Sequence, residues 1–535
     1  MNRIWILLIA APFVVAAIIV NFAFHSKSLP IIEQARNTAL AGNHTRAEKL
    51  YDDLLKADPL NIELHRLKIR THFNIPEKTG KHSYRDDKTI LAQYQTMAQS
   101  SDPKKSDIGY YALGYIEIMQ SRVEEALDSY LRVQNQELKY LNNSIGYVYM
   151  TKHNYEDAEV YFQTEINVNG NVSGAYSNLA KVYQHTDQSD KFATLLSNPD
   201  AKPYISDTVI RHFLYEDGDF RYTKYAFQIG DFTTTGLVGA ILILLSWLVF
   251  LLWIDVYEKE KLRHVFIAVV LGCGFSMLCT PLYDFYHLTL GWARNGNYLN
   301  DLLYCIFAIG VVEETVKILP FLILLRFKHI INESMDYIVY ASITALGFAF
   351  MENLLYFHES GLENILSRSL SASVLHMTLT SFVAYGLMYA KYKGSGANWV
   401  YFLGSFSAAC VIHGLYDFWI LSDGWVGELR ILSVLILFYA IQRYAIAIAN
   451  ALSHSEFSVG EGKLVRSAEY LGVALTCIAA YQYTVIGYKF GAENANLNLF
   501  SMLLSSAFLA YILVNILGKI QVSSGNWTSI ITAKR

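Results

Sequence analysis

Residues 234–254 read TTGLVGAILILLSWLVFLLWI, and no charged side chain interrupts this run. An α-helix of about 20 apolar residues is long enough to cross the hydrocarbon core of a bilayer, which is roughly 30 Å thick. The run therefore predicts a transmembrane helix. Further apolar segments lie at roughly 4–24, 264–281, 300–325, 337–357, 369–390, 398–421, 429–449, 468–488 and 497–518. We predict an all-α fold, a polytopic membrane helix bundle of about ten transmembrane helices.

The composition supports this class of protein. The chain has 535 residues, of which 53% are hydrophobic and 17% charged, with a mean hydropathy of +0.24. Soluble domains carry about 25% charged residues, so an entirely soluble enzyme is excluded. The net charge is −4 and no basic patch mixes with aromatic residues, which argues against nucleic acid as a partner. The five cysteines show no CxxC spacing, so neither a disulfide framework nor a cysteine zinc site is indicated.

Residues 25–230 are more polar and contain an internal repeat. Small and aromatic residues recur after 32 positions, where Leu113-Gly114, Ala126 and Tyr130 return as Ile145-Gly146, Ala158 and Phe162. This pattern resembles tetratricopeptide repeats, in which small residues lie where paired helices touch. Degenerate helical pairs of another kind are the alternative. Either reading predicts an α-solenoid, an architecture that commonly holds peptides or partner proteins on a concave face.

The membrane topology follows from the first segment and from the basic residues. Residues 1–24 predict an uncleaved transmembrane anchor, because the apolar run is longer than that of a signal peptide. With a cytoplasmic N-terminus, thirteen basic residues fall on the cytoplasmic side: Arg3, Lys259, Lys261, Arg263, Arg326, Lys328, Lys391, Lys393, Lys463, Arg466, Lys519, Lys534 and Arg535. Four fall in the opposite short loops: Arg294, Arg368, Arg430 and Lys489. This positive-inside bias predicts cytoplasmic termini and an extracytoplasmic repeat domain.

Ionisable residues occur inside four consecutive apolar segments. Charged groups at the bilayer centre cost on the order of 2.5 to 3.5 kcal/mol each, so those that persist are functional candidates. The first segment contains Glu313, Glu314 and Lys317, and helical spacing places Lys317 one turn from both acids. The second contains Glu352. A packed ion pair and a neutral interhelical hydrogen bond are the structural alternatives for these residues.

The other two segments carry histidines. His376 lies in the third, and His413 is followed in the fourth by Asp417 at i,i+4, where a carboxylate can fix the tautomer of an imidazole. Each histidine alone could be a structural hydrogen bonder. In the predicted topology Glu352 and both histidines lie in the extracytoplasmic halves of their helices, so we expect the four helices to converge on one polar cavity.

Three motifs in this region resemble the signatures of the PrsW family of intramembrane proteases. They are Glu313-Glu314-x-x-Lys317, Phe348-x-x-x-Glu352-Asn353 and His413-x-x-x-Asp417, on successive membrane segments. Asp336, Tyr356, Arg368 and His376 add to the resemblance. It implies a multi-pass protein of the bacterial cytoplasmic membrane. It also implies proteolysis of a membrane-anchored substrate near the extracytoplasmic face, with anti-sigma factors as the known kind of target.

The resemblance also suggests a division of the chain. We expect an anchor at 1–24, a repeat domain at 25–230, a PrsW-like protease core at 231–450, and two additional transmembrane helices with a tail at 451–535. The partners would be a single-pass protein substrate, the lipid bilayer, and proteins or peptides bound by the repeat domain.

Peptide hydrolysis needs an activated water, charge stabilisation and a proton for the leaving amine. We expect Glu313 or Glu314 to be the general base and Lys317 to hold the charge of the acid pair. His376 and His413 would polarise the carbonyl or bind the oxyanion, and Asp417 would orient His413. Glu352 would be a second base or a ligand.

Metal dependence stays open at this point. His376, His413 and Glu352 form a three-ligand set of the kind that binds catalytic Zn²⁺, although no HExxH motif is present. Metal-free chemistry is equally compatible with the residues. Two other functions remain: a proton-coupled transporter, since acids and histidines also form proton relays, and a non-catalytic envelope scaffold that binds partners through its repeats.

Overall fold

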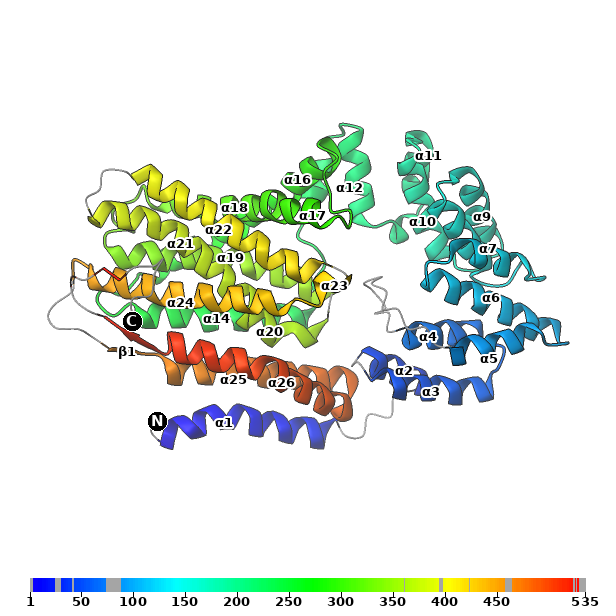
Figure 1. Cartoon of the computed structure of the whole chain (residues 1–535), viewed down its shortest axis with the longest axis horizontal. Helices are drawn as coiled ribbons and strands as arrows, with labels where there is room; N and C mark the ends of the chain where they lie inside the picture. Colours follow the sequence, from blue (N-terminus) through cyan, green and yellow to red (C-terminus); the bar gives the residue numbers. More distant parts are fainter. Residues whose placement is uncertain are drawn as a thin grey trace. The chain divides into compact units, whose positions relative to one another are not determined.

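The computed structural model describes residues 3–24, 30–40, 43–73, 88–359, 361–393, 398–422, 424–457, 464–522, 525 and 527–528. Three of the basic residues used for the topology, Lys463, Lys534 and Arg535, lie outside the described residues. The described chain is helical almost throughout, as predicted (Figure 1). It divides into two compact units, one formed by residues 1–26 with 227–535 and the other by residues 27–226.

The unit of residues 27–226 is a series of short helices. Its α-helices are α2 (Ile31–Leu40), α3 (His44–Ala57), α4 (Ile62–His72), α5 (Lys88–Ala98), α6 (Pro103–Met119), α7 (Val123–Leu131), α8 (Leu141–Thr151), α9 (Tyr155–Asn167), α10 (Val172–His185), α11 (Ser189–Ser197), α12 (Asp207–Glu216) and α13 (Tyr222–Ala226). Asparagine side chains begin several of them, for example Asn43 and Asn154, which accept a backbone N–H of the first turn.

The internal repeat corresponds to repeated packing. A Cβ on Gly114 would lie 2.7 Å from the ring of Tyr130, and one on Gly146 would lie 2.7 Å from the ring of Phe162. Only glycine allows these rings to lie so close to the neighbouring helix. The pairs α6 with α7 and α8 with α9 therefore pack in the same way. Assignment to the tetratricopeptide class stays a prediction.

The other unit holds the long apolar helices. Its α-helices are α1 (Arg3–Ile18), α14 (Thr234–Ile254), α15 (Leu262–Ser276), α16 (Cys279–Asp284), α17 (Tyr298–Tyr304), α18 (Val311–Leu324), α19 (Ser334–Glu359), α20 (Ile365–Leu370), α21 (Ala372–Lys393), α22 (Asn398–Leu421), α23 (Gly424–Gly427), α24 (Ile431–Ser453), α25 (Ala468–Phe490) and α26 (Ala492–Leu517). Two short strands, β1 (Leu464–Arg466) and β2 (Lys519–Gln521), pair antiparallel.

Eight helices in the described chain are long and apolar enough to cross a membrane. They account for eight of the ten expected spans. The first expected span forms the shorter apolar helix Leu7–Ala23. The expected span 300–325 is helical through α17, the π-helical stretch Cys305–Gly310 and α18, but it carries Glu313, Glu314 and Lys317. The protein is an all-α polytopic membrane helix bundle.

Helix α19 lies at the centre of this bundle and packs against α14, α15, α18 and α21 (Figure 1). Most of its side chains are buried. The approach of α15 is very close, because a Cβ on Gly272 would collide with the carbonyl oxygen of Thr344, and a Cβ on Gly347 with that of Val269. The two backbones are therefore in direct contact one turn before Met351 and Glu352.

Candidate active site

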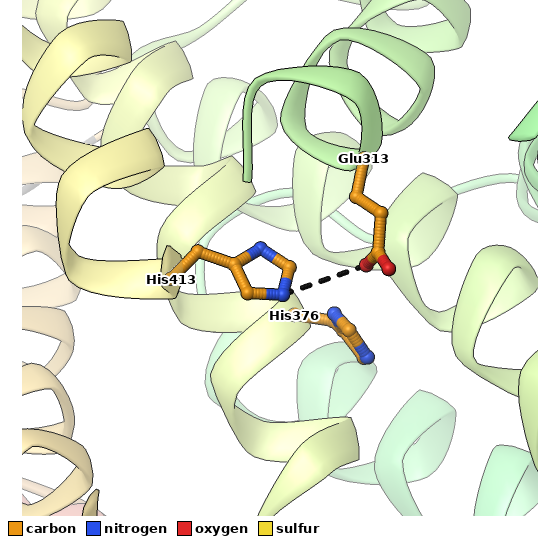
Figure 2. Close-up of side chains that lie close together, drawn as sticks. All are labelled: Glu313, His376 and His413. Atoms are coloured by element: carbon orange, nitrogen blue, oxygen red, sulfur yellow. Dashed lines mark ion pairs between the residues drawn. The ribbon is translucent and has the colours of Figure 1, made fainter. Parts of the chain in front are cut away.

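The ionisable residues of four helices meet inside the bundle. Glu313, Glu314 and Lys317 lie on the first two turns of α18, and Glu352 lies in the last third of α19. His376 lies near the start of α21, and His413 and Asp417 lie in the second half of α22. Figure 2 shows Glu313, His376 and His413 pointing toward one another from three helices. The expected convergence on one site is therefore present in the structure.

Lys317 lies at the centre of the group and is completely buried. Its Nζ atom lies 2.7 Å from Glu314 Oε1 and 3.5 Å from Glu313 Oε2. The same ammonium donates to Nδ1 of His376 at 2.9 Å and lies 3.4 Å from Nδ1 of His413. A buried ammonium is tolerated only when opposite charges surround it, which the two carboxylates provide.

His413 contacts carboxylates on both sides of its ring. Its Nδ1 atom lies 2.8 Å from Glu314 Oε1. Its Nε2 atom lies 3.5 Å from Glu313 Oε2 and 3.4 Å from Asp417 Oδ2. Glu314 is fully buried and has no exposed side-chain surface. Glu314 is thus placed to orient the imidazole, whereas Glu313 and Asp417 face its other nitrogen.

Glu352 lies beside the second histidine. His376 donates from Nε2 to Glu352 Oε2 at 2.8 Å, which agrees with acceptance at its Nδ1 from Lys317. Arg368 lies 2.8 Å from the same carboxylate oxygen and donates from Nε to Asn353 Oδ1 at 2.6 Å. The Arg368 guanidinium also stacks on the ring of Tyr356 at 3.7 Å. About a quarter of the Glu352 side chain is exposed, at 23%, so this carboxylate is more accessible than Glu313 at 11%.

Two further residues contact the site that the motifs do not include. Tyr283 on α16 donates its hydroxyl to Glu313 Oε1 at 2.8 Å. Thr380 on α21 donates to Glu314 Oε2 at 3.5 Å. Neither side chain is charged, and each lies on a helix other than α18. The spacing of charged residues along the sequence therefore did not predict that they contact the site. Asp336 lies in the first turn of α19 and is not part of the site. Glu352 follows 16 residues later, which is about 24 Å along a helix that rises 1.5 Å per residue.

One group of side chains has the spacing of a metal site. Ligand atoms of Glu313, His376 and His413 all lie within 4.8 Å of one another. Two imidazoles and one carboxylate are a usual ligand set for catalytic zinc. Lys317 faces Nδ1 of both rings. Nε2 of His413 faces Glu313, and Nε2 of His376 donates to Glu352, so a metal held by both Nε2 atoms would take the place of the proton on His376. These residues fit a zinc ion in type and spacing. The structure brings Glu313 to this group, whereas Glu352, expected in the ligand set from sequence, is bound to Arg368 and His376.

Fold and site together define an integral membrane protein with a buried centre of carboxylates, imidazoles and one ammonium. Residues 260–442 match the model of the PrsW family intramembrane metalloprotease. The chain is similar to Protease PrsW of Clostridioides difficile, with 28% identity over 37% of this chain and 85% of that protein. It is also similar to Protease PrsW of Geobacillus kaustophilus, with 27% identity over 35% of this chain and 81% of that protein. The corresponding protein of Bacillus subtilis is 27% identical over 31% of this chain and 72% of its own length.

No solved structure matches the chain. The family model and the curated relatives agree on the region that contains the site. This part of the chain is a PrsW family intramembrane protease domain, and the protein is a peptidase.

Proposed function

We propose that the protein hydrolyses a peptide bond of a membrane-anchored protein at this buried centre, and that Glu313 activates the attacking water. The observation that carries the proposal is the position of Glu313 Oε2. This buried oxygen has no hydrogen-bond partner in the part of the chain that the structure describes, and it lies 3.5 Å from both His413 Nε2 and Lys317 Nζ. A water bound there would meet a proton acceptor and an imidazole at the same time.

The remaining residues have separate roles in this proposal. Tyr283 holds the Glu313 carboxylate by its Oε1 atom, which leaves Oε2 for the water. Glu314 and Lys317 fix the orientation of His413, and Asp417 stabilises the charge on its ring. His376 is held between Lys317 and Glu352. With substrate bound, its Nε2–H would donate to the developing oxyanion or to the leaving amine in place of Glu352. Glu352 would receive or return a proton at the accessible side of the site.

A zinc ion is part of the proposal as a cofactor. Glu313, His376 and His413 would hold it. With zinc bound, Glu313 would be a ligand instead of the general base, and the ion would polarise the substrate carbonyl and lower the pKa of a water to about 7. The roles of Glu314, Lys317 and Asp417 in orienting His413 are the same with or without the ion.

The substrate that fits this site is a single-pass or otherwise membrane-anchored protein, of which an anti-sigma factor is one kind. We propose cleavage near the extracytoplasmic face of a bacterial cytoplasmic membrane, with both termini cytoplasmic and the repeat unit extracytoplasmic. The excess of basic residues in one set of loops supports this topology. The repeat unit would then bind the substrate or a partner on the side where cleavage occurs.

The test is cleavage of a tagged single-pass substrate in proteoliposomes. We expect Glu313→Gln, Glu314→Gln and His413→Ala each to lower the rate at least about 100-fold, as for removal of a group that acts in proton transfer. Glu469→Gln, at the start of α25, is the control and should cleave normally. Cleavage that survives all three site substitutions would contradict the proposal, and proton-coupled uptake lost in the same variants would identify a transporter instead.

A further inference from the structure

One arginine of the repeat unit lies against a cluster of tyrosines. Arg66 lies in the middle of α4, and its Cζ atom is 3.8 Å from the ring centroid of Tyr140 and 5.0 Å from that of Tyr115. Tyr115 stacks on Tyr111, one turn earlier in α6. All three tyrosines are buried. Their rings give the guanidinium cation–π contacts, which do not occupy its N–H groups as hydrogen bonds would.

The N–H groups of Arg66 have no acceptor in the part of the chain that the structure describes. Its Nε atom is buried and has no hydrogen-bond partner there. The side chain is only partly buried, so a ligand can reach its terminal nitrogens. A guanidinium carries five N–H donors in a planar fork, and buried polar groups are rarely left without hydrogen bonds. A carboxylate matches the geometry of this fork.

A second cation contacts the same tyrosine. The Nζ atom of Lys139 lies 4.8 Å from the ring centroid of Tyr140, and the Lys139 side chain is exposed. Two positive charges therefore lie against one ring. Like charges held close together repel each other, and an anion bound beside them would remove this repulsion.

Glu165 fixes the position of Tyr140 and forms no ion pair with either cation. It is fully buried, and its Oε1 atom accepts the backbone N–H of Tyr140 at 2.8 Å, while Oε2 accepts that of Asn143 at 3.0 Å. Tyr140 has a φ of +75°, in the left-handed region that bulky residues rarely adopt. The structure thus holds the ring that both cations contact in a defined place, as is common where a side chain serves binding.

We propose that Arg66 and Lys139 form an anion-binding site that recognises a carboxylate in an acidic segment of the protein substrate. This inference rests on the proposed function, in which the repeat unit binds the substrate. Arg66 would donate two parallel hydrogen bonds to the carboxylate, and Lys139 would add a flexible positive charge. Arginine and tyrosine are enriched at the centres of protein interfaces, which favours a peptide over a free anion.

The site gives the repeat unit a means of selecting substrates. An acidic segment outside the membrane would be bound by charge and by hydrogen bonds, whereas a neutral segment would leave the Arg66 donors unpaired. Selection would therefore depend on a part of the substrate that is not cleaved.

The experiment is fluorescence anisotropy of the full-length protein in a non-ionic detergent. The probe is a fluorescein-labelled peptide of alternating glutamate and serine, compared with the matching glutamine–serine peptide. We expect the glutamate peptide to bind at least about tenfold more tightly, and Arg66→Gln to remove this difference, because hydrogen bonds between charged groups are lost. Lys139→Gln should weaken binding less. Arg132→Gln is the matched control, because Arg132 is exposed and also contacts a tyrosine, with its Cζ atom 5.8 Å from the Tyr110 ring centroid.

Three results would overturn the proposal. They are equal binding of the two peptides, unchanged affinity in both Arg66→Gln and Lys139→Gln, and displacement of the peptide by an equal concentration of free glutamate, which would identify a small-molecule site. If Arg66→Gln does not fold, Lys139→Gln still decides, because its side chain is exposed. No cleavage step enters the measurement, so failure of the protease proposal would leave these results unchanged.

Discussion

The ammonium of Lys317 donates to Nδ1 of His376 at 2.9 Å, although the two residues are 59 positions apart and lie on different helices. This contact joins the acid pair of α18 to the histidine of α21. Through it the chain Glu352, His376, Lys317, Glu314 and His413 is continuous. Substitution of one member should therefore alter the hydrogen bonds and ion pairs of the others.

The central ammonium leads to the first prediction. Lys317→Met removes a buried positive charge and leaves Glu313 and Glu314 without the ammonium that contacts both. We expect the free energy of unfolding to fall by about 3 to 5 kcal/mol, the usual cost of breaking a buried pair by removing one partner. Thermal unfolding in detergent measures this, alongside cleavage. The double variant Lys317→Met/Glu314→Gln should recover part of the stability, and an unchanged melting temperature in Lys317→Met would contradict the geometry.

The hydroxyl of Tyr283 gives a second prediction. Tyr283→Phe removes the hydrogen bond to Glu313 Oε1 but keeps the ring. A hydrogen bond to a charged group is worth about 1.5 to 3 kcal/mol, so we expect kcat to fall roughly tenfold or more with little change in KM. Tyr286→Phe, which removes a hydroxyl three residues further along, is the control, and equal effects of both substitutions would argue against a specific role.

Metal removal tests the cofactor. We expect purified protein to contain close to one zinc ion per chain, and 1,10-phenanthroline to abolish cleavage until zinc is restored. His376→Ala and His413→Ala should each lose the ion, since each removes one of three ligands. Elemental analysis provides the measurement. Full activity in protein that contains almost no zinc would show instead that Glu313 activates water without a metal.

The repeat unit should be sensitive to acid through His65. Its neutral ring accepts from the Tyr94 hydroxyl at 3.0 Å and donates to the Pro59 carbonyl at 3.1 Å, and burial lowers its pKa below the ordinary value of 6.5. The unfolded chain therefore takes up the proton more readily, so the stability that this ring provides is present above pH 6.5 and is lost as pH falls below it.

Hydrogen exchange of α4 and α5 in the full-length protein measures this effect. Protection should decrease between pH 7 and pH 5 after correction for intrinsic exchange, and His65→Asn should remove that pH dependence. His153→Asn serves as the control, because His153 also contacts a tyrosine hydroxyl but is exposed. Equal pH dependence in the parent and in His65→Asn would rule out this assignment.

Substrate capture by the repeat unit gives the last prediction. Deleting residues 30–225 should lower cleavage of a full-length substrate but spare a short transmembrane peptide. Initial rates for both substrates in proteoliposomes measure the difference. Equal loss for the two would mean that the unit is required for folding and not for binding.

The sequence predicted the helical bundle and the residues that meet in it. Spacing along one helix determines neighbours such as Glu314 and Lys317, because an α-helix has 3.6 residues per turn. It does not determine which carboxylate faces which imidazole, since that depends on how helices pack and rotate. Glu352 was for this reason expected with both histidines, whereas the structure groups Glu313 with them. Tyr283 was not predicted, because its contact with Glu313 joins two residues that lie 30 positions apart on different helices.

The backbone contact at Gly272 and Gly347 has a consequence for how this protein would respond to mutation. A methyl group on Gly347 would push α19 off its neighbour and shift Glu352, five residues further on, relative to the His376 ring that it binds. An unbiased mutational scan would then score Gly347 as severely as a catalytic acid, although it offers no reactive group. Intolerance to substitution in this bundle therefore reports interhelical spacing as well as chemistry.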